Sequence, residues 1–188
     1  MKFINKITYI SLSLFVFFLW GYFVYDINVA YPSPQNIVYK ENQSFEYYGM
    51  KVTAGALEIC NYDEICNKID GYKEYTKDDR IMQNSYYILV NIHVENPSDQ
   101  DISLKNTGFT YWMIESGNCA NGVSQEMIYM VDYSNDVYKA GSNMDIELPF
   151  YIYKENTTAK SKEELLEQGI KIVAGYYPDK EYIFYGGK

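Results

Sequence analysis

Residues 86–104 read YYILVNIHVENPSDQDISL, and this stretch decides the fold class. From Ile88 to Glu95 apolar and polar residues alternate, which is the period of a strand with one buried face. Residues 96–100, NPSDQ, have the chemistry of a turn, because Pro fixes φ and Asn and Asp cap neighbouring backbone groups. Apolar residues resume at Ile102. The stretch therefore predicts a β-hairpin with one buried face.

Other segments with the composition of strands lie on both sides of this hairpin. They are bounded by Gly, Pro, Asn and Asp, and they comprise Phe45–Ile59, Phe109–Glu115, Met144–Tyr153, Ile170–Tyr177 and Glu181–Tyr185. Gly49 and Gly55 predict a turn and a bulge in the first of them. Pro149 removes a ladder donor from the third, which predicts an edge strand or a bulge.

Three stretches do not read as regular strands. Ser161–Gln168 predicts a helix, with Ser161 as its cap and Gly169 as its stop. Asn61–Asn84 is polar and aperiodic, so we expect a long loop with at most a short helical turn. Met127–Tyr133 predicts only a weak strand.

About seven short strands without a βαβ rhythm predict an all-β fold, an antiparallel β-sandwich. An N-terminal transmembrane helix precedes it. The expected boundaries are a cytoplasmic N-terminus at residues 1–6, the helix at 7–27, a linker at 28–44 and an extracytoplasmic sandwich at 45–188.

The predicted helix rests on a run without charges from Ile7 to Tyr25. This length is close to the roughly 20 apolar residues that cross a membrane. Lys2 and Lys6 precede the run, so the positive-inside rule places the N-terminus in the cytoplasm. The residues that we assign to the membrane include Ile7, Leu14, Phe18, Trp20 and Tyr25, the last two near the outer headgroups.

The alternative to an anchor is a cleaved signal peptide, whose apolar core is usually about 7–15 residues long. Here the run is longer, and the best cleavage sequence, Asn28-Val29-Ala30, has a poor residue at its first position. No cysteine lies near the end of the run, which argues against lipoprotein processing. We therefore expect a retained anchor. Tyr31-Pro32-Ser33-Pro34 predicts a stiff extended linker after it.

The chain has three cysteines, Cys60, Cys66 and Cys119. Outside the cell a disulfide is chemically feasible. Cys60 and Cys66 are close enough in sequence to form one, and either could instead pair with Cys119. Because the number is odd, at least one thiol is free or pairs between chains.

The composition argues against nucleic-acid binding. The chain has 16 basic and 25 acidic residues and a net charge of −9, whereas affinity for phosphates comes from Lys and Arg. The 22 tyrosines fit either a tyrosine-lined binding face or an AT-rich genome combined with the preference of tyrosine for strands.

Three segments together resemble a known kind of protein. They are the YYILVNIHVENPSDQDISL hairpin with its V-x-N end, the Lys139–Ser142 turn before IELPFYI, and the closing IVAGYYPDKEYIFY. They resemble an uncharacterised Firmicutes family of small membrane-anchored proteins with one immunoglobulin-like extracytoplasmic domain. The resemblance covers roughly Phe45–Tyr185. It implies an immunoglobulin-like sandwich and no functional residues, since the function of the family is unknown.

No catalytic, cofactor or metal residues are expected. His93 is the only histidine, so a histidine-dependent triad would have to use it, and its position on the polar face of a strand favours a surface role. Asp132–Asp136 alternates oxygen ligands but lacks the glycine and glutamate of a calcium loop. The acidic residues of Asn61–Asn84 are interspersed with lysines and favour a solvated loop.

These observations predict a non-catalytic envelope protein whose partner is another protein or a cell-wall component. The segments Asn61–Asn84 and Gly117–Val123 are the expected contact loops. The alternative is a carbohydrate-binding module that uses exposed aromatics among Tyr47, Tyr48, Tyr111 and Trp112. Alternation places Tyr111 and Trp112 on opposite faces, so only one of them is expected to be exposed. An enzyme with dispersed acidic residues is a further alternative.

Overall fold

The computed structural model describes residues 2–31, 35–104, 108–130 and 137–187. They form two compact units that divide between Gln35 and Asn36. The first unit contains helix α1 (Lys2–Ala30). Its segment Thr8–Ala30 is long and apolar enough to cross a membrane, a property that membrane anchors and signal sequences share. Leu14, Phe18, Trp20 and Tyr25 are exposed on this helix, and Ile7 lies within it.

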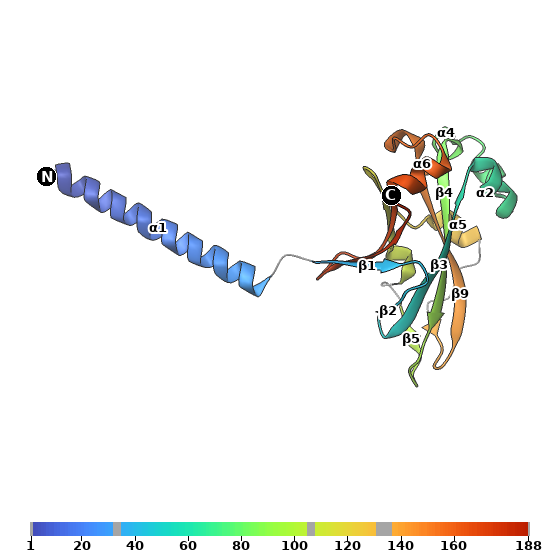
Figure 1. Ribbon diagram of the computed structural model, residues 1–188, viewed down its shortest axis with the longest axis horizontal. Helices are drawn as coiled ribbons and strands as arrows, with labels where there is room; N and C mark the ends of the chain where they lie inside the picture. Colours follow the sequence, from blue (N-terminus) through green and yellow to red (C-terminus); the bar gives the residue numbers. More distant parts are fainter. Residues whose placement is uncertain (1, 32–34, 105–107, 131–136, 188) are drawn as a thin grey trace. The chain divides into compact units, whose positions relative to one another are not determined.

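The second unit is a sandwich of two sheets. The first sheet has the order β1-β11-β10-β6-β7, with β1 Asn36–Lys40, β11 Lys180–Tyr185, β10 Ile170–Gly175, β6 Met113–Ser116 and β7 Cys119–Gly122. The second has the order β2-β3-β4-β9, with β2 Ser44–Tyr47, β3 Met50–Cys60, β4 Ser85–Glu95 and β9 Asn143–Tyr153. A short pair joins β5 (Ile102–Ser103) to β8 (Val137–Tyr138). In Figure 1, β3, β4 and β9 run side by side through the domain.

The inner faces of the two sheets share one hydrophobic core. Ile88, Val90, Ile92 and Val94 of β4 are fully or almost fully buried in it, as their alternation predicts. The same core contains Ile114 from β6, Ile172 from β10 and Ile183 from β11. Both sheets thus contribute side chains to one interior, which confirms a mostly β, sandwich-like fold.

Short helices cover part of the outer face of the second sheet. They are α2 (Tyr62–Lys68), α3 (Tyr72–Tyr75), α4 (Arg80–Gln83) and α5 (Gln125–Met130). Ile65, Ile69 and Tyr72 of this region pack with Tyr87 and Leu89, which point outward from β4. Helix α6 (Lys162–Gln168) lies with α2 and α4 at one end of the sandwich, while β2 and β5 lie towards the other (Figure 1).

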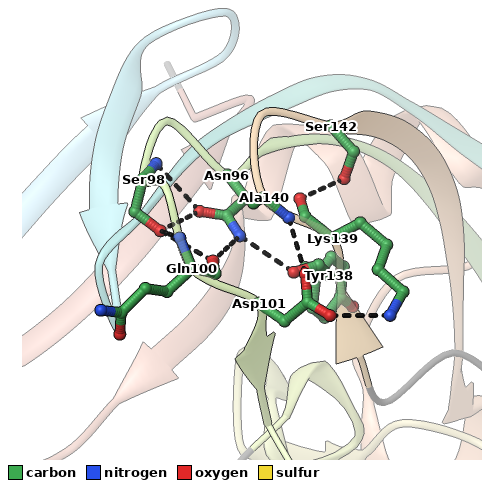
Figure 2. Close-up of polar contacts among 8 residues, drawn as sticks. All are labelled: Asn96, Ser98, Gln100, Asp101, Tyr138, Lys139, Ala140 and Ser142. Carbon is green, nitrogen blue, oxygen red and sulfur yellow. Dashed lines mark hydrogen bonds and ion pairs between the residues drawn. The ribbon is translucent and has the colours of Figure 1, made fainter.

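The turn after β4 is fixed by the side chain of Asn96, which is 1% exposed. Its amide donates hydrogen bonds to the carbonyls of Gln100 at 2.8 Å and Tyr138 at 2.9 Å. Its carbonyl oxygen accepts from the backbone and hydroxyl of Ser98 at 3.0 and 2.7 Å. Figure 2 shows that these bonds join the turn after β4 to the turn before β9. We call this arrangement the Asn96 clamp.

Asp101 makes a second set of contacts between the same two turns. Asp101 accepts from the backbone N–H of Ala140 at 3.0 Å and from Lys139 Nζ at 2.7 Å (Figure 2). The Asn96 backbone N–H also donates to the carbonyl of Ser142 at 2.9 Å. Since every hydrogen-bonding position of the Asn96 side chain is used within the chain, the clamp serves the fold and leaves no group for a ligand.

Several local predictions are confirmed. Tyr48 and Gly49 form the turn between β2 and β3, and the register between β3 and β4 shifts around Gly55. Pro149 lies on β9, which is an edge strand. Helix α6 is capped by Ser161, whose hydroxyl accepts from the N–H of Glu164 at 3.2 Å.

The predicted hairpin after β4 is wrong. Strand β4 pairs with β3 and β9, and β5 pairs with β8 instead. The long strands β3 and β9 satisfy the backbone of β4 along both edges, and the Asn96 clamp turns the chain away from it. One further pair departs from the expected antiparallel arrangement, because β1 runs parallel to β11.

The predicted loop Asn61–Asn84 is also wrong, because it contains helices α2, α3 and α4. Asn61 and Glu64 form a capping box at the start of α2, and this signature is visible in the sequence. Within the predicted weak strand Met127–Tyr133, residues 127–130 belong to helix α5, and residues 131–133 lie outside the described part of the chain.

Three boundaries also differ from those expected. Phe109–Tyr111 form a 3-10 turn, η1, and the strand begins only at Met113. Helix α1 continues to Ala30 rather than residue 27, and the sandwich begins at Asn36 rather than Phe45. The reason for the last difference is that β1 completes the first sheet beside β11.

We expect Asn96→Ala to lower the free energy of unfolding by about 2–4 kcal/mol, because it removes four hydrogen bonds and leaves the carbonyl of the buried residue Tyr138 without this donor. The matched control is Asn91→Ala, since Asn91 is an exposed residue of the preceding strand β4 and should change stability by less than about 0.5 kcal/mol. Urea denaturation of the full chain in a maltoside detergent measures both. Equal losses for the two variants would contradict a special role for the clamp.

Candidate functional site

A cavity of about 200 Å³ lies where two turns of the sandwich meet. One wall comes from the β2–β3 hairpin and the other from the end of β10 and the start of β11. The lining residues are Glu46, Tyr47, Tyr48, Ala174, Gly175, Tyr177 and Glu181. We call this cavity the Tyr48 pocket. Its lining combines aromatic rings with two carboxylates, and none of the described residues that line it is basic.

The first wall is built on a two-residue turn. Tyr47 pairs with Met50 across the hairpin, which leaves Tyr48 and Gly49 at its tip. Both have positive φ, 50° at Tyr48 and 80° at Gly49, as a type I′ turn requires. Glycine adopts this conformation freely, whereas a bulky residue is strained in it. Tyr48 is nevertheless 60% exposed, so burial of its ring does not explain the strain.

The second wall is the turn between β10 and β11. Tyr177 lies in this turn and is 80% exposed. The turn is fixed from behind by Glu115 of β6, which accepts from Lys180 Nζ at 2.6 and 2.8 Å and from the Tyr176 hydroxyl at 2.7 Å. Lys180 and Glu115 are only 24% and 21% exposed. This pair therefore holds the turn that presents Tyr177.

Burial shapes the acid–base properties of this support. It works to raise the pKa of Glu115, but hydrogen bonds from Lys180 and Tyr176 outweigh it and leave that pKa below its ordinary value. The pKa of Tyr176 is raised, first by burial and then by its bond to Glu115. At neutral pH the support is thus an ionised carboxylate held by an ammonium and a phenol.

The two carboxylates of the pocket have different surroundings. Glu181 accepts a hydrogen bond from the Tyr39 hydroxyl at 3.1 Å, and burial together with Glu181 raises the pKa of Tyr39 to about 12. Glu46 faces Lys51 across the hairpin. The ammonium of Lys51, however, bonds Glu95 at 2.8 Å. Glu46 therefore remains open to a group that enters the pocket.

Aromatic packing anchors the hairpin beneath the pocket. The ring of Tyr47 meets that of Trp112 edge-on, with centroids 5.4 Å apart. Trp112 stacks on Phe45 at 6.1 Å, and Phe45 stacks on Tyr39 at 4.3 Å. Because these rings come from β1, β2 and the residue directly before β6, the pocket floor is continuous with the core of the sandwich.

A second cavity, of about 330 Å³, borders the same hairpin. It is lined by Ser44, Phe45, Glu46, Gly49, Met50, Lys51 and Pro97. Phe45 and Met50 are buried, and Lys51 is paired with Glu95. This cavity shares Glu46 with the Tyr48 pocket but offers fewer exposed aromatic groups to a ligand.

The structure separates the four aromatics that the sequence suggested as sugar-binding residues. Tyr47 and Tyr48 line the pocket. Tyr111 is 63% exposed but does not line it, and Trp112 is fully buried, so only one of these neighbours is exposed, as predicted. Sequence reasoning did not select Glu46, Tyr177 or Glu181, because no sequence signal shows that the two turns meet in space.

The expected contact loops are more ordered than predicted. Asn61–Asn84 packs its helices onto β4 through Ile65, Ile69 and Tyr72. Within Gly117–Val123, residues 119–122 form strand β7 at the edge of the first sheet. Neither segment contributes a residue to the described lining of the Tyr48 pocket.

The three cysteines are free thiols in the structure, so it contains no Cys60–Cys66 disulfide. Cys60 and Cys119 are buried, while Cys66 is partly buried. Burial raises the pKa of Cys60 to about 11, and it also raises the pKa of Cys66 and of Cys119. These thiols therefore lack the reactive thiolate character of catalytic cysteines.

His93 and the acidic residues of Asn61–Asn84 make local pair and capping contacts in the structure. His93 Nδ1 lies 2.6 Å from Asp145 on the partly exposed face of the second sheet. Asp79 caps α4, and Glu64 caps α2 and pairs with Lys162. Across the described ranges no group of three or more His, Cys, Asp and Glu side chains is placed to hold a metal ion. The stretch Asp132–Asp136, which its sequence argues against as a calcium loop, lies outside these ranges.

Comparison with known proteins identifies a family without an assigned activity. The profile of a family described as a domain of unknown function, DUF5028, matches residues 24–181. No curated protein matches the sequence.

Solved structures of similar fold come from Firmicutes genera. A conserved hypothetical protein from Bacillus anthracis has 14% identity and a TM-score of 0.46, covering 77% of this chain and 94% of that one. An uncharacterised β-sandwich protein from Clostridium difficile has 10% identity and a TM-score of 0.44, covering 81% and 94%. A functionally unknown protein from Listeria monocytogenes has 9% identity and a TM-score of 0.47, covering 78% and 82%.

The strain at Tyr48 predicts that Tyr48→Asn stabilises the domain. Asn tolerates positive φ and favours a type I′ turn before glycine, so relief of strain should outweigh loss of the edge contact with Tyr47. We expect the free energy of unfolding to rise by about 0.5–1 kcal/mol, measured by urea denaturation. A loss of stability would instead show that packing of the Tyr48 ring holds the hairpin together.

The Glu115–Lys180 pair predicts a pH-dependent effect. Since folding lowers the pKa of Glu115, its contribution is present at neutral pH and is lost as pH falls below about 4.5. Glu115→Gln should therefore cost about 1–2 kcal/mol at neutral pH, and the difference from the parent chain should shrink under acid. Denaturation over a pH series measures it. Glu95→Gln, which breaks the more exposed Lys51–Glu95 pair, is the control and should cost less at neutral pH. A cost of Glu115→Gln that does not change with pH would contradict the role assigned to the Glu115–Lys180 pair.

Proposed function

The chain belongs to the DUF5028 family, and from this premise we propose that it is a non-catalytic binding module of the cell envelope. In this proposal helix α1 holds the domain at the outer face of the membrane. The domain presents the Tyr48 pocket to a cell-wall component or another envelope protein. The observation that carries the proposal is the convergence of exposed tyrosines and carboxylates on one cavity.

The proposed location rests on the N-terminal helix. Thr8–Ala30 is long and apolar enough to span a bilayer. Lys2 and Lys6 lie before it, and positive charge favours the cytoplasmic side. The sandwich would then be extracytoplasmic, with the helix as a single-pass anchor. Trp20 and Tyr25 would suit the outer headgroup region, where amphipathic rings are enriched.

The order of the strands supports an immunoglobulin-like reading of the sandwich. That fold places strands B and E in one sheet and C, F and G in the other. Here β4 and β9 share one sheet, while β6, β10 and β11 share the other. Trp112 is buried directly before β6, in the region where antibody-type domains carry a buried tryptophan on strand C.

The pocket favours binding over catalysis. Glu46 and Glu181 are two carboxylates in one cavity, which a glycoside hydrolase would also need. Glu46, however, is exposed on β2, and Glu181 is only half-buried on β11, so neither is enclosed in a water-excluded site of the kind that assists bond cleavage. Tyr48 and Tyr177 instead offer rigid, exposed contact area, which is typical of recognition surfaces.

A carbohydrate is the second candidate ligand. The exposed rings of Tyr48 and Tyr177 provide flat apolar faces beside Glu46 and Glu181. Such faces can pack against sugar rings while carboxylates accept hydrogen bonds from hydroxyls. The same pocket would serve this function, so an experiment that reports the partner of the pocket distinguishes a sugar polymer from a protein.

Photocrosslinking in the native bacterium tests the proposal. Benzoylphenylalanine placed at position 48 or 177 should give high-mass adducts after illumination, because both side chains are exposed at the pocket. The same substitution at Tyr111, equally exposed but outside the pocket, is the control. Digestion with a wall hydrolase or a protease then assigns the partner class. No adducts at the pocket, or equal adducts at Tyr111, would overturn the proposal.

A further inference from the structure

We propose that the ligand group recognised by the Tyr48 pocket is an organic ammonium ion. This inference rests on the proposed function, since it names the chemistry that the pocket would recognise on its envelope partner. It follows from three features of the described residues: the composition of the lining, the way this chain holds its own lysines, and the size of the cavity.

The lining is complementary to a cation. Tyr48 and Tyr177 contribute aromatic rings, and the faces of such rings attract ammonium groups. Glu46 and Glu181 contribute negative charge, and none of the described residues that line the cavity is basic. A neutral ligand can pack on the rings and donate hydroxyl hydrogen bonds to the carboxylates, but it leaves their negative charge unbalanced. An anionic ligand would be repelled, because like charges close together are unfavourable.

The neighbouring support shows the same chemistry with an internal cation. Lys180 Nζ lies 2.6 Å from a Glu115 oxygen and 5.2 Å from the centroid of the Tyr176 ring. It is also 6.0 Å from the Tyr182 ring. An ammonium between a carboxylate and tyrosine rings is therefore a stable arrangement in this part of the domain, and the Tyr48 pocket presents the same two kinds of group.

The lysines closest to the pocket in sequence and register are already engaged. Lys51 is the cross-strand neighbour of Glu46, and its ammonium bonds Glu95 at 2.8 Å. Lys180 is the chain neighbour of Glu181, and its ammonium is held by Glu115. Neither neutralises the pocket carboxylates, so the cation that complements them would come from outside the chain.

The size of the cavity limits the ligand to a small group. Its volume of about 200 Å³ is below the 300–1,000 Å³ typical of pockets for whole drug-sized molecules. It suits one ammonium group carried by a larger molecule. A methylated ammonium would use the rings most, and a primary ammonium would use the carboxylates most. Both types belong to the proposed class.

Chemical-shift titration tests the inference on the full chain in a maltoside detergent, which carries no ammonium. Choline and ethanolamine are the probes. The neutral isostere of choline, in which carbon replaces the ammonium nitrogen, is the matched control. We expect saturable shifts at the amides of Tyr48, Gly49, Gly175 and Tyr177 with at least one ammonium probe and none with the isostere. Choline alone or ethanolamine alone would support the inference and report which ammonium type is preferred.

Variants separate the two kinds of group. Tyr48→Ala and Tyr177→Ala should each weaken binding about three- to tenfold, the effect of one ring on a bound cation. Glu46→Gln combined with Glu181→Gln should weaken it at least as much. Glu155→Gln is the charge control. Glu155 lies in η2 (Lys154–Asn156), directly after β9, and it does not line the pocket. The end of β9 that precedes it pairs with Ser85, at the start of β4.

The outcomes distinguish this inference from the proposed function. No shifts, or equal shifts with the neutral isostere, would overturn the ammonium assignment even if crosslinks form at positions 48 and 177. Shifts with choline or ethanolamine that survive all four pocket substitutions would overturn the assignment to this pocket. Ammonium binding without crosslinks in the bacterium would support the ligand class and reject the proposed envelope role.

Discussion

Burial of strand β4 on both faces is the constraint on which the domain depends. Its residues from Ser85 to Val90 are all buried, whereas a strand on the surface of a sandwich usually buries alternate residues. Ile88 and Val90 face the first sheet, and Tyr87 and Leu89 face the helical cover. A strand in this position needs hydrogen-bonding partners on both edges, and β3 and β9 supply them along almost its whole length.

This constraint accounts for the parts of the chain that look least regular in sequence. The helices between Asn61 and Asn84 cover Tyr87 and Leu89, so the polar segment is needed to bury the outer face of β4. The Asn96 clamp then ends the strand and directs the chain away. The backbone of Asn96 also bonds Ser142, the residue directly before β9. The hydrogen bonds of this turn therefore help to set the register between β4 and β9.

The sequence predicts the features that depend on local pattern. Alternation in β4, turn chemistry at Gly49, the cap at Ser161 and the edge position of Pro149 are all set by neighbours along the chain. The predicted pairing of β4 with the segment at Ile102 was wrong. Local turn signals indicate that two segments could pair, but they do not show that the distant strand β9 takes the same edge of β4. The helices of Asn61–Asn84 were missed although Ile65, Ile69 and Tyr72 have helical spacing, since a charged background obscured three apolar residues.

The candidate site was only half predictable for the same reason. Tyr47 and Tyr48 stand out as adjacent aromatics in a strand and turn, so sequence alone suggests them. Glu46, Tyr177 and Glu181 acquire meaning only when two turns from different sheets meet. That meeting is fixed by long-range contacts: the stack from Trp112 to Tyr39 under one turn and the Glu115–Lys180 pair behind the other. Rigid supports of this kind hold a binding constellation in place.

Tyr48 shows how stability and recognition separate in this site. A residue held at positive φ without compensating burial costs the fold free energy, and Asn or Gly would form the same turn with less strain. Yet the ring of Tyr48 is mostly exposed and lines a cavity whose other groups are Tyr177 and two carboxylates. If the turn served only to connect β2 and β3, nothing in its geometry would require an aromatic ring at this position. Among the aromatic rings of the described residues, that of Tyr48 meets only the ring of Tyr47, edge-on, which is why the proposed recognition role is assigned to it.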